Sequence, residues 1–229
     1  MTRGMAINPK PPGGPSKLRA QIGRDVAARL AADPRVREVG AKDVQMVRVD
    51  GFLDEGQCAA LIAEIDARRR PSTLLSKSAD KAFRTSDSCD MVRYSDLVRP
   101  IDESIAALLG IVPENGETMQ GQRYAPEQHF RAHHDYFHES EPYWPGMRDS
   151  GGQRTWTAMV YLNDVEEGGA TWFPLAGVRV RPKRGLLLAW NNMAPDGRPN
   201  MQTLHEGMPV VEGVKYIVTK WFREGKWVG

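Results

Sequence analysis

The sequence has little cysteine, which limits how the fold can be held together. Cys58 and Cys89 are the only cysteines in 229 residues, so they could form one bridge but neither a disulfide framework nor a metal-spaced pair. Cys58 also falls on an apolar helical repeat, where a free thiol behaves as a small hydrophobic group. Free thiols in a reducing compartment are the simpler interpretation.

Long apolar runs are absent as well. No segment approaches the roughly 18 consecutive apolar residues of a membrane-spanning helix. The first residues contain no apolar stretch resembling a secretion signal. We therefore expect no membrane partner and a cytoplasmic location.

An excess of charge of one sign is also missing. The 31 Lys and Arg residues nearly balance the 29 Asp and Glu residues, so no broad electrostatic pattern indicates nucleic acid. Basic residues do cluster at residues 68–70 and 179–184. We interpret both clusters as solvated faces rather than a site for a polyanion.

What the sequence does contain is a change near residue 117 from patterns typical of helices to patterns typical of short strands. Residues 1–15 are rich in proline and glycine and predict a flexible arm. Residues 16–229 predict a single domain, with helical support over 16–116 and a strand-rich core over 117–229. The helix signals are a cap at Ser16, an end near residue 33, a capping box at Asp54 and Gln57, a start at Pro100 and a stop at Gly110.

The strand signals are runs of β-branched and aromatic residues. They cover residues 45–49, 155–162, 186–190 and 215–222. Helices followed by short strands predict an α+β fold that is mainly β, with helices supporting one side of the core. The polar stretch over residues 137–152 predicts a functional or mobile loop.

The histidines suggest a metal site. All five lie in the second half, and His133 and Asp135 are two residues apart, so on an extended strand they point the same way. His205 lies far downstream and could complete two imidazoles and one carboxylate, the set that non-haem iron oxygenases use. His134 would then face away. The spacing alone is weak evidence, and surface histidines in a loop are the alternative.

A lysine on the last strand adds a second signal. Period-two geometry places Lys215, Ile217, Thr219 and Trp221 on one face of residues 215–222. A lysine among apolar neighbours needs an anion, and the distal carboxylate of 2-oxoglutarate would supply one. The alternative is an edge lysine that reaches solvent.

At these residues the chain resembles the prolyl 4-hydroxylase branch of the Fe(II)/2-oxoglutarate dioxygenases. The resemblance covers roughly residues 44–227, and the motifs occur in the family's order. They are Phe52-Leu53, Arg84-Thr85-Ser86, Gln120-Gly121-Gln122-Arg123-Tyr124, His133-His134-Asp135, Gly152-Gln153-Arg154 leading into Tyr161-Leu162-Asn163-Asp164, Gly168-Gly169-Ala170-Thr171-Trp172-Phe173-Pro174, and His205 through Gly213-Val214-Lys215 to Trp221.

The resemblance implies a double-stranded β-helix (jelly roll) with supporting N-terminal helices. It also implies that Tyr124 and Thr171 join Lys215 at the far carboxylate of 2-oxoglutarate, and that Trp221 walls this pocket. For each of these side chains, ordinary core packing with a satisfied hydroxyl is the alternative. The family often has glycine where Glu127 stands, so the turn after Tyr124 is expected to differ.

Three residues are candidate substrate contacts. Arg84 resembles a family position on a substrate-covering loop, and Arg154 resembles an arginine near the substrate groove. Surface arginines are the alternative in both cases. Trp144, in the polar stretch over residues 137–152, could stack on a proline ring or cover a bound peptide. The alternative is that this loop packs on its own surface.

The implied reaction uses Fe(II), 2-oxoglutarate and O₂, with ascorbate as a candidate reductant, and releases succinate and CO₂. The cofactor carries the difficult chemistry, and Asp135 fills the position that a halogenating relative leaves to halide. We expect hydroxylation of prolyl residues, at the 4-position, in a peptide or protein. The same chemistry on a free amino acid or another side chain, and a non-enzymatic metal-binding jelly roll, are the alternatives. Neither the physiological target nor the oligomeric state follows from the sequence.

Overall fold

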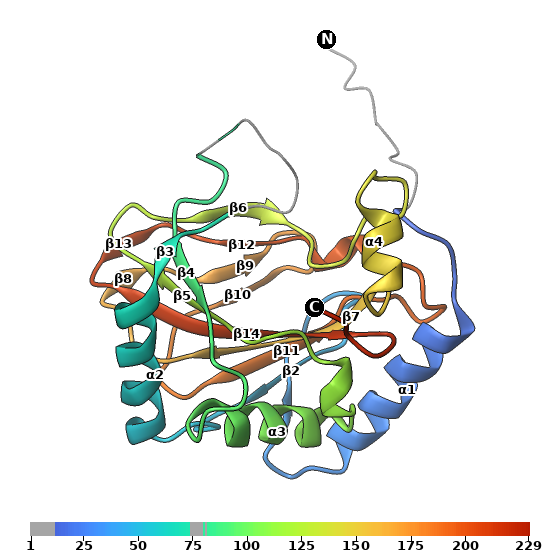
Figure 1. The fold of residues 1–229 in the computed structure, drawn as a ribbon, viewed down its shortest axis with the longest axis horizontal. Helices are drawn as coiled ribbons and strands as arrows, with labels where there is room; N and C mark the ends of the chain where they lie inside the picture. The colour runs from blue at the N-terminus through green and yellow to red at the C-terminus, as the bar shows by residue number, and fades with distance from the viewer. Residues whose placement is uncertain (1–11, 74–79, 81) are drawn as a thin grey trace.

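The computed structural model describes residues 12–73, 80 and 82–229, and within these its strands form two main antiparallel sheets (Figure 1). The large sheet has the strand order β1-β2-β11-β7-β14-β5-β4-β3, the small one β10-β9-β12-β6, and β13 pairs with β8. The strands are β1 (Arg37–Glu38), β2 (Met46–Val49), β3 (Arg70–Pro71), β4 (Asp87–Asp90), β5 (Gln120–Tyr124), β6 (Phe130–His133), β7 (Arg154–Tyr161), β8 (Glu167–Gly168), β9 (Thr171–Phe173), β10 (Val178–Val180), β11 (Leu187–Asn191), β12 (His205–Gly207), β13 (Val210–Glu212) and β14 (Lys215–Arg223).

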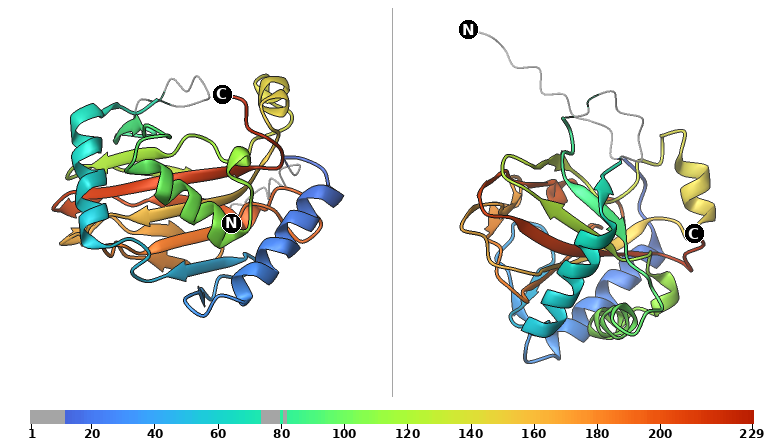
Figure 2. Two further views of the ribbon diagram at one scale, coloured as in Figure 1. Left: turned by 60° about the horizontal axis from the view of Figure 1, so that its bottom comes forward. Right: turned by 60° about the vertical axis from the view of Figure 1, so that its left-hand side comes forward.

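Helices cover the outer face of the large sheet, as the views in Figure 2 show. The α-helices are α1 (Lys17–Ala31), α2 (Glu55–Arg68), α3 (Val98–Leu109) and α4 (Trp144–Asp149), with 3-10 turns η1 (Pro113–Asn115) and η2 (Met201–Thr203). The described helices are each too short or too polar to cross a membrane.

All but one of the expected helix start and stop signals are confirmed. The Ser16 side chain accepts a hydrogen bond from the Arg19 N–H, and Asp54 and Gln57 form the reciprocal capping box of α2. Gly110 ends α3 in the left-handed conformation with φ 68°. The expected start at Pro100 was two residues late, because the Ser95 hydroxyl accepts from the Val98 N–H and opens the helix there.

Period-two alternation divides the core into two layers. Along β7, Trp156, Ala158 and Val160 face the helices, whereas Met159 and Tyr161 face the space between the two sheets. The predicted jelly roll with helical support on one side is therefore confirmed in outline. β1 to β4 lie at the two ends of the large sheet, so residues before 117 contribute strands as well as helices.

Two segments need separate description. Residues 137–152, expected to be a loop, contain α4, which lies apart from α2 and α3 (Figure 1). Residues 1–11 of the predicted arm lie outside the described residues. Pro12 is buried, and its carbonyl accepts a hydrogen bond from the Glu139 N–H (2.8 Å). The described end of the arm is thus docked against the segment that contains α4.

Candidate active site

The three predicted metal ligands come together at one edge of the small sheet. His133 ends β6 and His205 begins β12, and the two residues are direct partners in the antiparallel register. Asp135 follows two residues after His133. Their nearest ligand atoms all lie within 4.8 Å of one another, so a single ion can reach all three.

Hydrogen bonds to the backbone orient both imidazoles toward that point. Nδ1 of His133 lies 2.8 Å from the Arg131 carbonyl, and Nδ1 of His205 lies 2.9 Å from the Thr203 carbonyl. Because a carbonyl only accepts, each Nδ1 carries the proton and each Nε2 keeps its lone pair. Both Nε2 atoms lie 3.9 Å from the Asp135 carboxylate.

The electrostatics favour the protonation states that a metal needs. Burial lowers the pKa of His133 to about 3, with His205 adding to the shift. Burial raises the pKa of Asp135, but the two imidazoles and Arg154 outweigh it, so the net shift is downward. The Thr157 hydroxyl donates to Asp135 (2.7 Å) and itself accepts from Asn192 (2.9 Å). The neutral His133 imidazole facing a fixed carboxylate is ready to bind a cation.

His134 faces away from this cluster, as predicted. Its Nε2 lies 3.1 Å from the Met201 carbonyl, and its ring stacks on Tyr136 with centroids 4.5 Å apart. The ring of His133 instead stacks on Phe130 at 3.6 Å. Neighbouring histidines therefore have separate partners.

A second cavity adjoins the metal cluster and contains the predicted 2-oxoglutarate residues. Tyr124, Thr171, Lys215 and Trp221 all line it, together with the three metal-ligand candidates. Ile217 and Thr219 line it too, which confirms the predicted inward face of β14. The predicted residues thus form one continuous site.

Lys215 is the unusual member of this cavity. Its side chain is 1% exposed, and burial lowers its pKa to about 7. Within the part of the chain that the structure describes, no carboxylate lies within ion-pair distance of its ammonium. The ammonium lies 4.9 Å from the centroid of the Tyr124 ring and 5.6 Å from that of the Tyr161 ring. A buried cation without an anion fits the distal carboxylate of 2-oxoglutarate.

The structure adds residues that sequence reasoning missed around Lys215. The Tyr161 hydroxyl donates to Thr171 (2.7 Å), and the Tyr124 hydroxyl donates to the Gln122 side chain (2.7 Å). The Gln122 amide in turn donates to Thr219 (3.1 Å). Tyr161 stands in a motif of the resemblance, and alternation along β7 was the signal that would have placed it on the face between the two sheets, beside Thr171.

The candidate substrate residues are placed differently from one another. Arg84 lines both cavities, its guanidinium lies over the Phe130 ring (4.7 Å), and it donates to Gln120 (2.9 Å). Trp144 starts α4 and is not among the described residues that line either cavity. Its neighbour Tyr143 lines the larger one. The aromatic side chain that faces the opening is therefore Tyr143.

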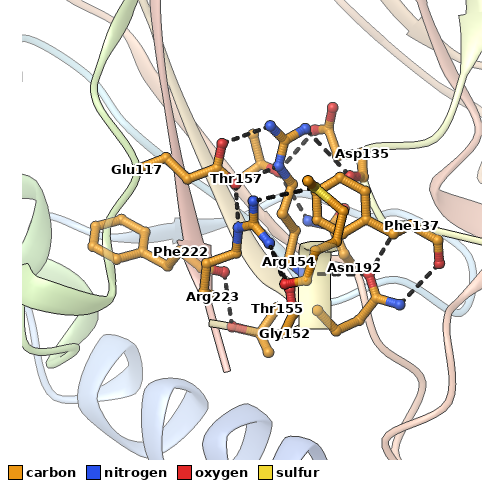
Figure 3. Close-up of polar contacts among 12 residues, drawn as sticks. Glu117, Asp135, Phe137, Gly152, Arg154, Thr155, Thr157, Asn192, Phe222 and Arg223 are labelled. Atoms are coloured by element: carbon orange, nitrogen blue, oxygen red, sulfur yellow. Dashed lines mark hydrogen bonds and ion pairs between the residues drawn. The ribbon is translucent and has the colours of Figure 1, made fainter. Parts of the chain in front are cut away.

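Arg154 is half-buried in an ion-pair network, not free at a loop end (Figure 3). It donates two hydrogen bonds of 2.6 Å to Glu117, which also accepts from Arg223. Its guanidinium lies between the Trp221 ring (4.2 Å) and the Phe137 ring (4.9 Å). Glu117 thus fixes Arg154 against Trp221, which lines the cofactor cavity, and Phe137, which lines the larger cavity. Sequence reasoning missed Glu117 because its partners lie far away in the sequence.

The larger cavity is open and has a volume of about 940 Å³. Its lining includes His133 and Asp135 and seven aromatic side chains, namely Phe83, Phe130, Tyr136, Phe137, Tyr143, Trp221 and Trp227. A chain bound here would pass directly over the metal cluster.

The turn after Tyr124 keeps a glycine-like conformation although it has no glycine. Glu127 has φ 69°, in the left-handed region that costs a non-glycine residue roughly 1–2 kcal/mol. Glu127 therefore holds a backbone conformation that glycine adopts without this cost. That the turn differs from the family's stays a prediction.

Two imidazoles, a carboxylate and an adjacent buried cation inside a jelly roll define the site of an oxygenase that binds a metal and a dicarboxylate. A model of the 2OG-Fe(II) oxygenase superfamily matches residues 119–223. Prolyl 4-hydroxylase 1 of Arabidopsis thaliana is 31% identical over 82% of this chain and 71% of its own length. Prolyl 4-hydroxylase 5 of the same plant is 33% identical over 81% and 70%.

The solved structures agree with this match. A viral collagen prolyl hydroxylase from Paramecium Bursaria Chlorella virus-1, solved as a 2OG complex, has a TM-score of 0.63 and 28% identity, over 80% of this chain and 96% of its own. The chain belongs to the 2-oxoglutarate- and Fe(II)-dependent oxygenases, in their prolyl 4-hydroxylase-like branch. It is a dioxygenase whose cofactors are Fe(II) and 2-oxoglutarate.

Proposed function

We propose that this enzyme hydroxylates prolyl residues of a peptide or protein at the 4-position, with release of succinate and CO₂. The observation that carries the proposal is the open, aromatic-lined cavity of about 940 Å³ directly beside the His133–Asp135–His205 cluster. Aromatic faces suit proline rings and extended peptides. The names of the relatives support the same substrate class.

The residues divide into three roles. His133, Asp135 and His205 would hold Fe(II), because their ligand atoms lie within 4.8 Å of one another and the pKa shifts of His133 and Asp135 favour metal binding. Lys215, Tyr124 and Thr171 would hold the far carboxylate of 2-oxoglutarate, with Trp221 as a wall. Bound Fe(II) with 2-oxoglutarate and O₂ supplies the oxidising power for converting a C–H bond into a hydroxyl.

The protein's own contribution is positioning. Thr157 and the two backbone carbonyls fix the metal ligands before any ion binds. Arg84 and Tyr143 border the open cavity and would orient the peptide over the metal. Arg154 would act through Trp221 and Phe137, because Glu117 already occupies its guanidinium.

The rival substrate is a free amino acid. A small closed pocket would suit such a ligand, whereas the cavity here is open and has a volume of about 940 Å³. The non-enzymatic alternative does not explain Lys215, since a structural metal site has no need of a buried cation beside it. Ascorbate as the reductant and a cytoplasmic location complete the proposal, and the free buried thiols of Cys58 and Cys89 support a reducing compartment.

The test is mass spectrometry of proline-containing peptides after turnover, with free proline and an alanine-matched peptide as controls. The proposal expects a gain of one oxygen on a peptide proline, and fragmentation with an authentic 4-hydroxyproline standard locates it. Oxygen gain on free proline alone would favour the rival substrate and overturn the peptide assignment.

A further inference from the structure

A third cavity lies away from the metal cluster, at the other edge of the small sheet. β10 is the last strand at that edge, and β6, which carries His133, is at the opposite edge. The cavity has a volume of about 450 Å³. It is lined by Val39, Arg48, Asp164, Val178, Arg179, Val180, Arg181, Pro182, Lys183 and Leu186, which together we call the basic cleft.

The positive charges of the basic cleft outnumber the carboxylates available to them. Lys183 and Arg48 share one carboxylate, Asp50, at 2.9 and 3.5 Å. Asp164 accepts a hydrogen bond from the backbone N–H of Arg184. Four cations therefore meet two carboxylates here, a local excess equal to the formal net charge of +2 of the whole chain.

Two arginines carry this excess. Among the described residues, no carboxylate forms an ion pair with Arg179 or Arg181, and both side chains are exposed. Arg179 lies over the Trp172 ring (5.4 Å). In the sheet register Trp172 stands between Arg179 and Glu206. The Trp172 side chain therefore separates Arg179 from Glu206, the nearest acidic residue along the sheet. Held in place by the ring, the Arg179 guanidinium is ready to bind a carboxylate in forked geometry.

The floor of the cleft favours a peptide over a nucleic acid. Val178 and Leu186 are 8% and 3% exposed and supply an apolar base between the cations. No aromatic side chain is among the described residues that line the cleft, so bases would have no stacking platform. β10 pairs with β9 on one side only, and an exposed strand edge is where an extended peptide can add.

We propose that the basic cleft binds an acidic segment of the polypeptide substrate. The proposal takes from the proposed function only that the substrate is a polypeptide. Three interstrand spacings separate β10 from β6, roughly 14 Å, and an extended chain covers about 3.3 Å per residue. The acidic segment therefore lies at least about five residues from the proline over the metal cluster.

Direct binding tests the cleft without any need for turnover. The probe is a fluorescent glutamate-rich peptide without proline, and its control replaces each glutamate by glutamine. We expect the acidic peptide to bind at low salt and the glutamine peptide to bind at least tenfold more weakly. Arg179→Glu/Arg181→Glu should weaken binding of the acidic peptide by at least tenfold. Arg24→Glu/Arg99→Glu, which changes the charge equally on exposed helix positions, should have little effect.

Equal loss in both double variants would show general electrostatic attraction and overturn the proposal. So would tighter competition by a single-stranded oligonucleotide or by inorganic phosphate than by the acidic peptide. In a second arm, an acidic segment appended about five or more residues from the proline should lower the KM of the proline peptide several-fold, and only with Arg179 and Arg181 present. Absence of proline hydroxylation with intact acidic-peptide binding would refute the proposed function and leave the cleft assignment standing.

Discussion

At the scale of single residues, the structure predicts different effects for substitutions of the adjacent residues His133 and His134. His133→Ala, Asp135→Ala or His205→Ala should abolish turnover and weaken iron binding while the fold is kept. His134→Ala should keep most of its activity, because its ring bonds the Met201 carbonyl and not the cluster. Iron binding by titration and succinate release measure both effects. An inactive His134→Ala beside an active His133→Ala would refute the ligand assignment.

Lys215 provides the second residue-scale prediction. Lys215→Ala leaves the far carboxylate of 2-oxoglutarate without its cation in a largely dry cavity, a loss of about 2–5 kcal/mol by analogy with truncated buried pairs. The KM for 2-oxoglutarate should therefore rise by more than about tenfold. Lys215→Arg should rescue only partly, because a planar fork needs different room from an ammonium. An unchanged KM for 2-oxoglutarate in Lys215→Ala would refute the assignment of Lys215 to the 2-oxoglutarate site.

The pKa of Lys215 adds a pH dependence. Burial lowers it to about 7, so in the ligand-free protein the ammonium loses its proton above that pH. A carboxylate binds the protonated form, and the affinity for 2-oxoglutarate should fall as pH rises from about 7 to 9. Calorimetry under anaerobic conditions measures it in the wild type and in Lys215→Met, whose affinity should be weaker and flat over this range. Parallel curves would contradict the prediction.

The contribution of Lys215 to stability changes with pH in the opposite direction. Between the folded pKa of about 7 and the unfolded value of about 10.4, the unfolded chain holds the proton and the folded chain does not. The Lys215 contribution to the free energy of unfolding therefore rises with pH across this window. Below it both states are protonated and the contribution is constant. The difference in unfolding free energy between wild type and Lys215→Met isolates this effect.

Sequence spacing identified the residues at the metal site and missed those that hold them. His133, Asp135 and Lys215 follow from period two on strands, which is a local rule, and His205 was added as the histidine that lies far downstream. Glu117 was not foreseen because its partners Arg154 and Arg223 lie far along the chain. Burial and pairing of that kind depend on the sheet order, which local patterns do not contain.

At the scale of elements, the segment over residues 137–152 joins the metal strand to β7. Gln153 is fully buried and bonds both the N–H and the carbonyl of Phe137 (2.6 and 2.9 Å). The base of the segment is thus fixed, while Tyr143 faces the open cavity. The short helix α4 escaped prediction because Pro145 and Gly146 are typical of turns, although proline also fits a helix's first turn.

This arrangement predicts different effects for two adjacent aromatic residues. Tyr143→Ala should raise the KM for a proline peptide by about two- to tenfold, the scale of one lost aromatic contact. Trp144→Ala should change it less, because Trp144 lines neither cavity. Neither should alter the KM for 2-oxoglutarate. Amide exchange over residues 139–150 should slow when peptide binds. A larger effect from Trp144→Ala would contradict the placement of the two rings.

At the scale of the whole molecule, the layers explain how a short motif becomes a site. α1, α2 and α3 cover one face of the large sheet, and the small sheet covers the other. β12 and β6 bring His205 next to His133 across the sheet, and β14 carries Lys215 into the same cavity. The texture of the sequence predicted this architecture. It predicted β2 but not β1, β3 and β4, because strands of two to four residues carry little periodicity.

The central claim is that one site couples 2-oxoglutarate turnover to hydroxylation of a peptide proline. The most direct measurement is the ratio of succinate formed to hydroxyproline formed, for a proline peptide and its alanine-matched control, with and without Fe(II). We expect a ratio near one with the proline peptide and Fe(II), little succinate with the alanine peptide, and none without iron or in Asp135→Ala. Succinate release that is independent of the peptide proline, with no gain of oxygen on the peptide, would contradict the account.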